Sequence, residues 1–288
     1  MGLKSVGVAW VATLLPVLGM LASWEQASAR VMRRTMGVLA TPRFAVADAA
    51  PAHVDDTTLA SALPPIEVPE APPGVYFSGP TDTAMVALTF DDGPSPTLTP
   101  RILEILREHD ARATFFVLGQ QAERHTDALR VLVESGQEIG NHAFSHTSFR
   151  SLFPTQIAEE LDRTARAIAN AGGSKPRLVR PPYGRFPDST IALAASRGED
   201  LVLWTVDGGD SEHADTDTIV ARVLRGARPG SVILLHDRDL DTLHALPAIL
   251  AGLARKGLKV VSVSELLGQS NASLSAAHSD LGKSETPT

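Results

Sequence analysis

The stretch ALTFDDGPSP (87–96) ends an apolar run abruptly at two adjacent acids, Asp91 and Asp92. The run before them, MVALTF (85–90), has the β-branched and aromatic residues of a buried strand, and the Gly-Pro pair after them breaks regular structure. Taken alone, the stretch fits a plain acidic turn as well as it fits a functional site. The residues at the ends of the other strands decide between the two.

Short β-type runs alternate with amphipathic helical segments from Met85 to about Leu267, which is typical of a parallel α/β sheet. One such segment (154–173) carries apolar residues at helical spacing and ends at a Gly-Gly C-cap signal. The pattern suits either an open doubly wound sheet or a closed, short barrel. Seven strands are expected, at residues 85–90, 113–119, 138–142, 177–180, 201–206, 231–236 and 258–263.

Ionisable residues gather just past the C-terminal ends of five of these strands. Ligands of parallel α/β folds bind at that edge, because the loops that follow the strands there are not needed for packing of the core. The coincidence of five such positions indicates a functional site. In chain order the residues are Asp91 and Asp92, His142 and His146, Arg180, Asp207, and His236 with Asp237.

The spacing of His142 and His146 brings two imidazoles to one side of a helical turn or a tight loop. No Glu lies between them, so the His-Glu-x-x-His pattern of zincins is absent and a base must come from elsewhere. Two His and one carboxylate leave positions open for water and substrate on a hydrolytic metal. Because neighbouring strand residues point to opposite faces, we expect Asp91 and Asp92 to divide the tasks of ligand and general base.

Composition excludes several other classes of function. The 288 residues are 43% hydrophobic and 20% charged, which suits one large domain with extensions. A net charge of -7 without a basic stripe argues against a nucleic-acid partner. The absence of cysteine excludes disulfides, thiol catalysis and thiolate metal ligands.

The N-terminus has the layout of an export signal. Lys4 precedes an apolar run (6–22) and a small-residue cleavage site, Ala-Ser-Ala, that ends at Ala29. We therefore expect an exported protein that is secreted, periplasmic or at the cell surface, with residues 1–29 either cleaved or kept as a membrane anchor. The remaining boundaries expected are an Ala/Pro-rich linker at 30–80, a folded domain at 81–268 and a disordered tail at 269–288.

The segment TFDDGP (89–94) resembles the first motif of the polysaccharide deacetylases, the NodB-homology domain of carbohydrate esterase family 4. Four further motifs of that family occur after it in the family's order, and the resemblance extends roughly from Ala84 to Leu267. They are HAFSH (142–146), RPPYG (180–184), DGGDS (207–211) and LLHD (234–237).

The resemblance implies an α/β fold, a distorted (β/α) barrel with about seven parallel strands. It also implies a metal-dependent hydrolase that removes N-acetyl groups from amino sugars of a polysaccharide or oligosaccharide, either peptidoglycan or a chitin-like glycan. The divalent metal is usually Zn²⁺ in the family, with Co²⁺, Mn²⁺ or Ni²⁺ as alternatives. Two other interpretations are a deacylase of another amide or of an acetyl ester, and a catalytically silent glycan-binding domain.

By the same resemblance, Asp92, His142 and His146 would bind the metal, and Asp91 would be the base that takes a proton from water. Arg180 would orient Asp91, for which a bidentate contact suits the fork of the guanidinium.

His236 would protonate the departing amine, and its partner would be Asp210 rather than Asp207. A nearby carboxylate raises the pKa of a histidine by stabilising the imidazolium. The backbone N–H of Tyr183 would stabilise the oxyanion. The other substrate-contacting residues implied are Pro182, Gly184 and Leu234.

Two residues depart from the family pattern. Ala143 stands where Ser or Thr usually comes after the first metal-binding His, and Ser211 stands where a Trp usually forms one wall of the substrate groove. Both changes bear on groove shape and substrate rather than on the metal or proton-transfer groups. Trp204 is expected in the core, and the histidines expected at the surface are His109, His125, His213 and His244.

Overall fold

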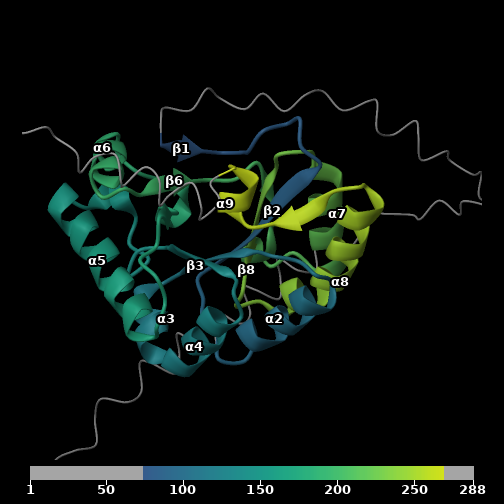
Figure 1. Ribbon diagram of the computed structural model, residues 1–288, viewed down its shortest axis with the longest axis horizontal. Helices are drawn as coiled ribbons and strands as arrows, with labels where there is room; N and C mark the ends of the chain where they lie inside the picture. The colour runs from purple at the N-terminus through teal and green to yellow at the C-terminus, as the bar shows by residue number, and fades with distance from the viewer. Residues whose placement is uncertain (1–73, 269–288) are drawn as a thin grey trace, which may run out of the picture. The chain divides into compact units, whose positions relative to one another are not determined.

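Nine parallel strands form one curled sheet in the computed structural model, which describes residues 74–268 (Figure 1). The strands are β1 Val75–Tyr76, β2 Met85–Asp91, β3 Thr114–Val117, β4 Glu138–Asn141, β5 Leu178–Val179, β6 Asp200–Val202, β7 Val206–Asp207, β8 Val232–His236 and β9 Lys259–Val261. The α-helices are α2 Thr99–Glu108, α3 Gly119–Arg124, α4 Thr126–Glu134, α5 Pro154–Asn170, α6 Ser189–Ser196, α7 Thr216–Gly226, α8 Leu240–Arg255 and α9 Val263–Leu266. Short 3-10 helices are η1 Phe149–Ser151, η2 Pro182–Gly184 and η3 Asp210–Glu212.

Strand β2 lies at the centre of the sheet, whose order is β1-β6-β5-β4-β3-β2-β8-β7. It pairs with β8 over residues 87–91, while β9 pairs with its first half and β3 with its last three residues. This fork curls the sheet around β2. The prediction of an α/β fold with parallel strands in a distorted barrel is confirmed.

The strand predicted at 201–206 is in fact two strands at opposite ends of the sheet. β6 pairs with β1 and β5, whereas β7 pairs only with β8, so residues 203–205 cross between the two ends. The carbonyls of Val202 and Leu203 accept from the guanidinium of Arg180 at this break, which replaces ladder hydrogen bonds. Periodicity alone could not reveal a change of partner within a continuous apolar run.

Residues 74–80 belong to the folded domain, although the sequence placed its boundary at 81. β1 extends the sheet, Ser78 forms a bridge with Ser231, and the backbone N–H of Gly79 donates to Gly230 over 2.8 Å. The predicted export signal (1–29), most of the linker and the predicted tail (269–288) lie outside the described residues. Within residues 74–268, no helix has both the length and the apolarity needed to cross a membrane.

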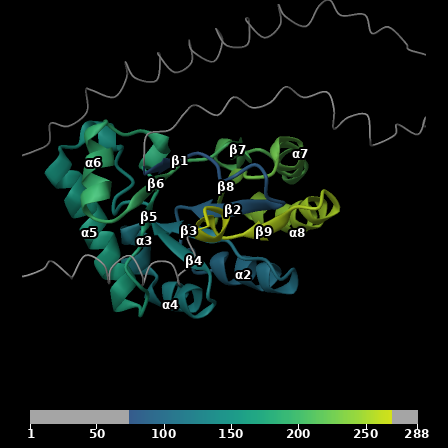
Figure 2. The same cartoon turned by 45° about the horizontal axis from the view of Figure 1, so that its top comes forward.

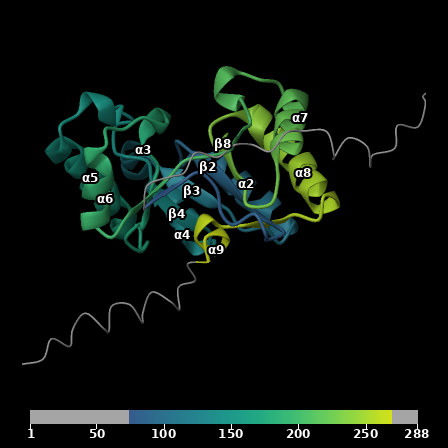
Figure 3. The same ribbon diagram turned by 90° about the horizontal axis from the view of Figure 1, so that it is seen from above.

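The two faces of the sheet have different roles, because side chains alternate along each strand. Val86, Leu88 and Phe90 of β2 point outward into a core shared with helices, while Thr89 and Asp91 point to the inner face. The helices cover the outer face in the order α6, α5, α3, α4, α2, α8, α7, as Figures 1–3 show from three directions.

The inner face is apolar at one end and polar at the other. Residues including Ala87, Phe116 and Val232 pack there with Val263 and Leu266 of α9, which closes the end where the strands begin. The C-terminal ends of the strands carry the polar residues. The sheet therefore presents a single polar edge over an apolar floor.

Asn141 joins β4 to the helix behind it and to the loop after it. Its buried amide donates to the carbonyl of Leu161 in α5 over 2.9 Å and accepts from the N–H of Ala143 over 2.9 Å. Removing the amide leaves a buried backbone N–H without an acceptor, which costs about 1–3 kcal/mol. We predict that Asn141→Ala lowers the free energy of unfolding by that amount in urea titration.

The matched control is Asn170→Ala at the exposed end of α5, which should change the free energy of unfolding by less than about 0.5 kcal/mol. Equal effects of the two substitutions would contradict this role of Asn141.

Candidate active site

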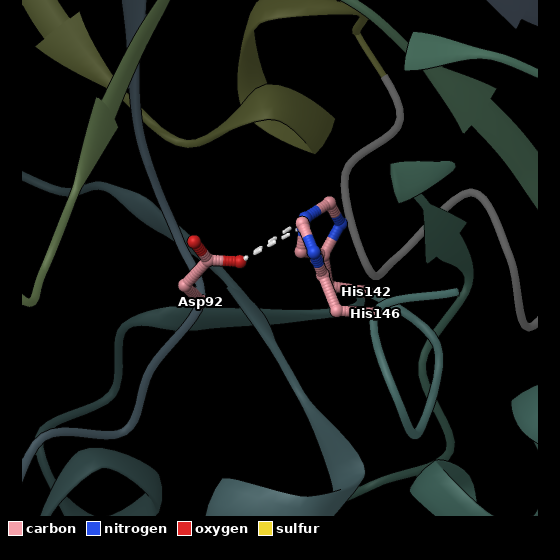
Figure 4. Close-up of side chains that lie close together, drawn as sticks. All are labelled: Asp92, His142 and His146. Atoms are coloured by element: carbon pink, nitrogen blue, oxygen red, sulfur yellow. Dashed lines mark ion pairs between the residues drawn. The ribbon is translucent and has the colours of Figure 1, made fainter. Parts of the chain in front are cut away.

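Asp92, His142 and His146 meet at the C-terminal ends of β2 and β4 (Figure 4). Asp92 Oδ1 lies 3.5 Å from Nε2 of His142 and 3.3 Å from Nε2 of His146. One ligand atom of each residue falls within 4.8 Å of the other two. The sequence-predicted trio is thus brought together, with Asp92 and His142 buried and His146 half-buried.

Left-handed backbone positions create this geometry. Asp92 has φ 74°, so it turns away just after β2 ends at Asp91. Strand alternation, the predicted reason for separating the two acids, therefore applies to Asp91 alone. Ala143 at φ 66° and His146 at φ 62° fold the histidine segment into a tight loop rather than a helical turn. Left-handed non-glycine residues cost about 1–3 kcal/mol each and persist only where the surroundings hold them.

The residues present fit a divalent cation. His142 Nδ1 lies 2.7 Å from the carbonyl of Arg180, which can only accept, so Nδ1 donates and Nε2 is the nitrogen that faces Asp92 as a potential ligand. Burial lowers the pKa of His146 and outweighs the opposing charge of Asp92, which keeps its ring neutral. Asp92 Oδ1 is buried and has no hydrogen-bond partner among the described residues. One potential ligand atom of each residue therefore converges on one point, within 4.8 Å of the other two.

Arg180 holds Asp91 on the inner face of the sheet. Its guanidinium is fully buried and donates through Nη1 to Asp91 Oδ1 and to Thr89 Oγ1, each over 2.7 Å. The contact is single rather than bidentate, because Nε and Nη2 donate to the carbonyls of Val202 and Leu203 over 3.1 Å. Asp91 Oδ2 is left facing the histidines, 3.6 Å from Nε2 of His142.

His236 and Asp210 form the second charged pair. His236 Nδ1 lies 2.9 Å from Asp210 Oδ1, and the backbone N–H of His236 donates to Oδ2. Burial acts to lower the pKa of His236, but the hydrogen bond and charge of Asp210 raise it to about 9. Burial acts to raise the pKa of Asp210, and hydrogen bonds from His236 and Thr242 lower it below the ordinary value. Asp207, the other candidate partner, is exposed and instead accepts from Gly209 N–H.

Helix η2 brings the predicted oxyanion residue to the same edge. Tyr183 has φ 60°, and its ring packs edge-on against His146 with centroids 4.6 Å apart. Its backbone N–H has no acceptor among the described residues. Gly184 lies against the ring of Trp204, where an added Cβ would come within 2.9 Å. Pro182 is buried in η2 beside Tyr183.

Leu234 and Trp204 lie on the inner side of the sheet. Leu234 lies two residues before His236 on β8, so both face inward, and it is buried. Trp204 is half-buried against the inner apolar cluster, in the crossing between β6 and β7. Of the histidines expected at the surface, His125 is half-buried, and the exposed ones are His109, His213 and His244.

Sequence reasoning missed several residues at this edge. Arg238 Nε lies 3.2 Å from Asp92 Oδ2, and its side chain is 62% exposed. Thr242 donates to Asp210, and Thr99 donates to the buried Asp237 over 2.5 Å. The position of Arg238 directly after the LLHD motif was the one available signal. The two threonines lie on helices, where no pattern singles them out.

Comparison with known proteins gives the family. Residues 78–202 match the family model described as polysaccharide deacetylase. A peptidoglycan-N-acetylglucosamine deacetylase of Bacillus cereus is 36% identical over 191 residues, which cover 65% of this chain and 70% of that protein. A chitooligosaccharide deacetylase of Bradyrhizobium sp. is 34% identical over 200 residues, 64% of this chain and 91% of the relative. The chain belongs to the polysaccharide deacetylase family.

Solved structures agree with this assignment. The crystal structure of a peptidoglycan N-acetylglucosamine deacetylase with a bound N-hydroxybenzamide matches with a TM-score of 0.66 and 34% identity, over 68% of this chain and 94% of the other. A CE4 family pseudoenzyme from Bacillus anthracis also matches with a TM-score of 0.66 and 33% identity, over 69% and 70%. The fold therefore occurs both with and without activity.

Metal content provides a direct test of the ligand trio. We predict about one divalent ion per chain in protein equilibrated with Zn²⁺. The ion should be lost in His142→Ala, because the two protein ligands that remain are too few to bind it tightly. Elemental analysis after dialysis measures both. The control, His213→Ala at an exposed position, should retain the ion. Undiminished metal in His142→Ala would contradict the assignment.

The pairing of His236 with Asp210 predicts that the pKa of His236 depends on the Asp210 carboxylate. In Asp210→Asn the pKa of His236 should fall from about 9 to about its ordinary value of 6.5 or below, since burial then acts without its counter-charge. Titration of the imidazole protons by NMR in the metal-free protein measures this change. Asp207→Asn removes an exposed carboxylate nearby in the chain and should leave the value near 9. A fall of the same size in both variants would mean that Asp210 is not the specific partner.

Proposed function

We propose that this chain is a metal-dependent hydrolase that removes N-acetyl groups from the amino sugars of a glycan, either peptidoglycan or a chitin-like polymer. The observation that carries the proposal is the meeting of three groups at one sheet edge. These are the ligand trio around Asp92, the base candidate Asp91 with Arg180, and the acid candidate His236 with Asp210. The relatives' activities on peptidoglycan and on chitooligosaccharides support the substrate class.

Asp92, His142 and His146 would hold the cation, and two imidazoles with one carboxylate suit Zn²⁺, with Co²⁺, Mn²⁺ or Ni²⁺ as alternatives. When bound, the ion supplies Lewis acidity to the amide carbonyl and to water. Asp91 is the base that accepts the proton of the attacking water, through the oxygen that Arg180 leaves free.

His236 delivers a proton to the nitrogen of the leaving amine. A pKa of about 9 keeps its imidazolium protonated at neutral pH, and Asp210 holds the ring by Nδ1 so that Nε2 carries the proton outward. The backbone N–H of Tyr183 lies free of any acceptor in the described part of the chain and donates to the carbonyl oxygen as charge develops there. Acid and base are thus separate groups with separate partners.

The proposed place of action is outside the cytoplasm. The relatives named as peptidoglycan deacetylases support it, and it is consistent with the export signal or anchor expected in residues 1–29.

A catalytically silent glycan-binding domain is disfavoured, because the acid, base and ligand residues are all present in this chain. The similarity to a pseudoenzyme structure makes this alternative worth testing.

Acetate release tests the function. Zn²⁺-loaded enzyme should release acetate from soluble peptidoglycan fragments or from chitooligosaccharides, and Asp91→Asn should lower kcat by at least about 100-fold with metal retained. Asp207→Asn, the same change at an exposed carboxylate, should keep near-wild-type kcat. Release only from acetyl-ester glycans would favour the esterase alternative. No release from any member of the panel would favour the silent domain.

A further inference from the structure

The loop that carries both histidine ligands is clamped from outside by one carboxylate, that of Glu160 in α5. Glu160 Oε2 accepts from the backbone N–H groups of Phe144 and Ser145 over 2.9 and 2.7 Å. Both of its oxygens also lie within 3.0 Å of the Ser145 hydroxyl. Glu160 is half-buried and makes no ion pair among the described residues, so the loop is its main partner.

Helix α3 holds the same loop through its backbone N–H groups. The N–H of Gly119 donates to the carbonyl of Ala143 over 3.0 Å, and the N–H of Gln120 donates to that of Phe144 over 3.0 Å. One turn after Glu160, the guanidinium of Arg163 lies 3.5 Å from the centre of the Phe144 ring. The loop carbonyls accept hydrogen bonds from α3, and the loop N–H groups donate hydrogen bonds to Glu160, so the two contacts are complementary.

The loop needs such a hold because of its conformation. Ala143 and His146 both have left-handed backbone, which non-glycine residues adopt only when the surroundings enforce it. Ala143 has no polar side-chain atom with which to brace the turn itself. The N–H groups that donate to Glu160 belong to the two residues between Ala143 and His146. A shift of this part of the loop would move both imidazoles relative to Asp92.

We propose that Glu160 is a positioning residue of the metal site, which keeps His142 and His146 aimed at Asp92. The inference rests on the proposed metal-binding role of that trio and extends it to a residue that touches neither the ion nor the substrate. Outer partners that orient metal ligands change metal affinity by about 10–100-fold when removed.

The hydrogen bonds of Glu160 allow its geometric role to be tested apart from its negative charge. A single oxygen, Oε2, accepts both backbone N–H groups, and the other oxygen contacts only the Ser145 hydroxyl. A glutamine can place its carbonyl oxygen at the first position and its NH₂ group against the hydroxyl, which can accept. Glu160→Gln therefore preserves the clamp without the charge, and Glu160→Ala removes it.

The experiment measures the dissociation constant for Zn²⁺ by competition with a chelator in the full chain. Glu160→Ala should raise it by at least about 10-fold, while Glu160→Gln should stay within about threefold of wild type. The control is Glu159→Ala, the exposed neighbour on the same helix, which should bind like wild type. The visible spectrum of the Co²⁺-loaded forms should change in Glu160→Ala only, because it reports ligand geometry.

Three outcomes would overturn the proposal. A wild-type dissociation constant in Glu160→Ala, with a reduced free energy of unfolding, would make Glu160 a purely structural residue. Equal weakening in Glu160→Ala and Glu160→Gln would make charge the cause. If wild type itself bound no metal, the ligand assignment would fail and the role of Glu160 with it, a result that the wild-type titration shows separately.

Discussion

The buried guanidinium of Arg180 is the constraint on which the rest of the site depends. Removing such a charge from water costs several kcal/mol unless every donor is paired. Its partners are Asp91, Thr89 and two carbonyls at the break between β6 and β7, while its own carbonyl accepts from His142. One side chain thus requires the ends of β2, β5 and β6 to meet in a single arrangement, and that arrangement orients Asp91, the proposed base, and His142, a proposed metal ligand.

The two carboxylates that are proposed to assist proton transfer, Asp91 and Asp210, have different partners. Asp91 faces a permanent cation, Arg180, which fixes the orientation of its carboxylate. Asp210 faces a histidine and receives further hydrogen bonds from Thr242 and from backbone N–H groups. It stabilises the imidazolium of His236, whose pKa lies near 9. These environments lie at one edge of the sheet, as the proposed acid–base chemistry needs.

The departures from the family pattern leave this machinery in place. Ala143 is fully buried, and the loop around it is held by backbone bonds and by Glu160 rather than by a hydroxyl at that position. Ser211 is exposed, and its backbone N–H donates to Asp210 over 3.0 Å, so it contributes a hydrogen bond to the partner of His236.

The sequence by itself determined the alternation of strands and helices and the edge of the sheet that carries the polar residues. These depend on local rules, because strand ends and side-chain alternation are set by neighbours in the chain. The family motifs added Asp92, His142 and His146 as candidate metal ligands. The sequence did not reveal the break at 203–205, the strand at Val75, or the supporting roles of Thr242 and Glu160. Only the tertiary structure decided these, since each depends on a partner far away in the chain that packing brings within hydrogen-bonding distance.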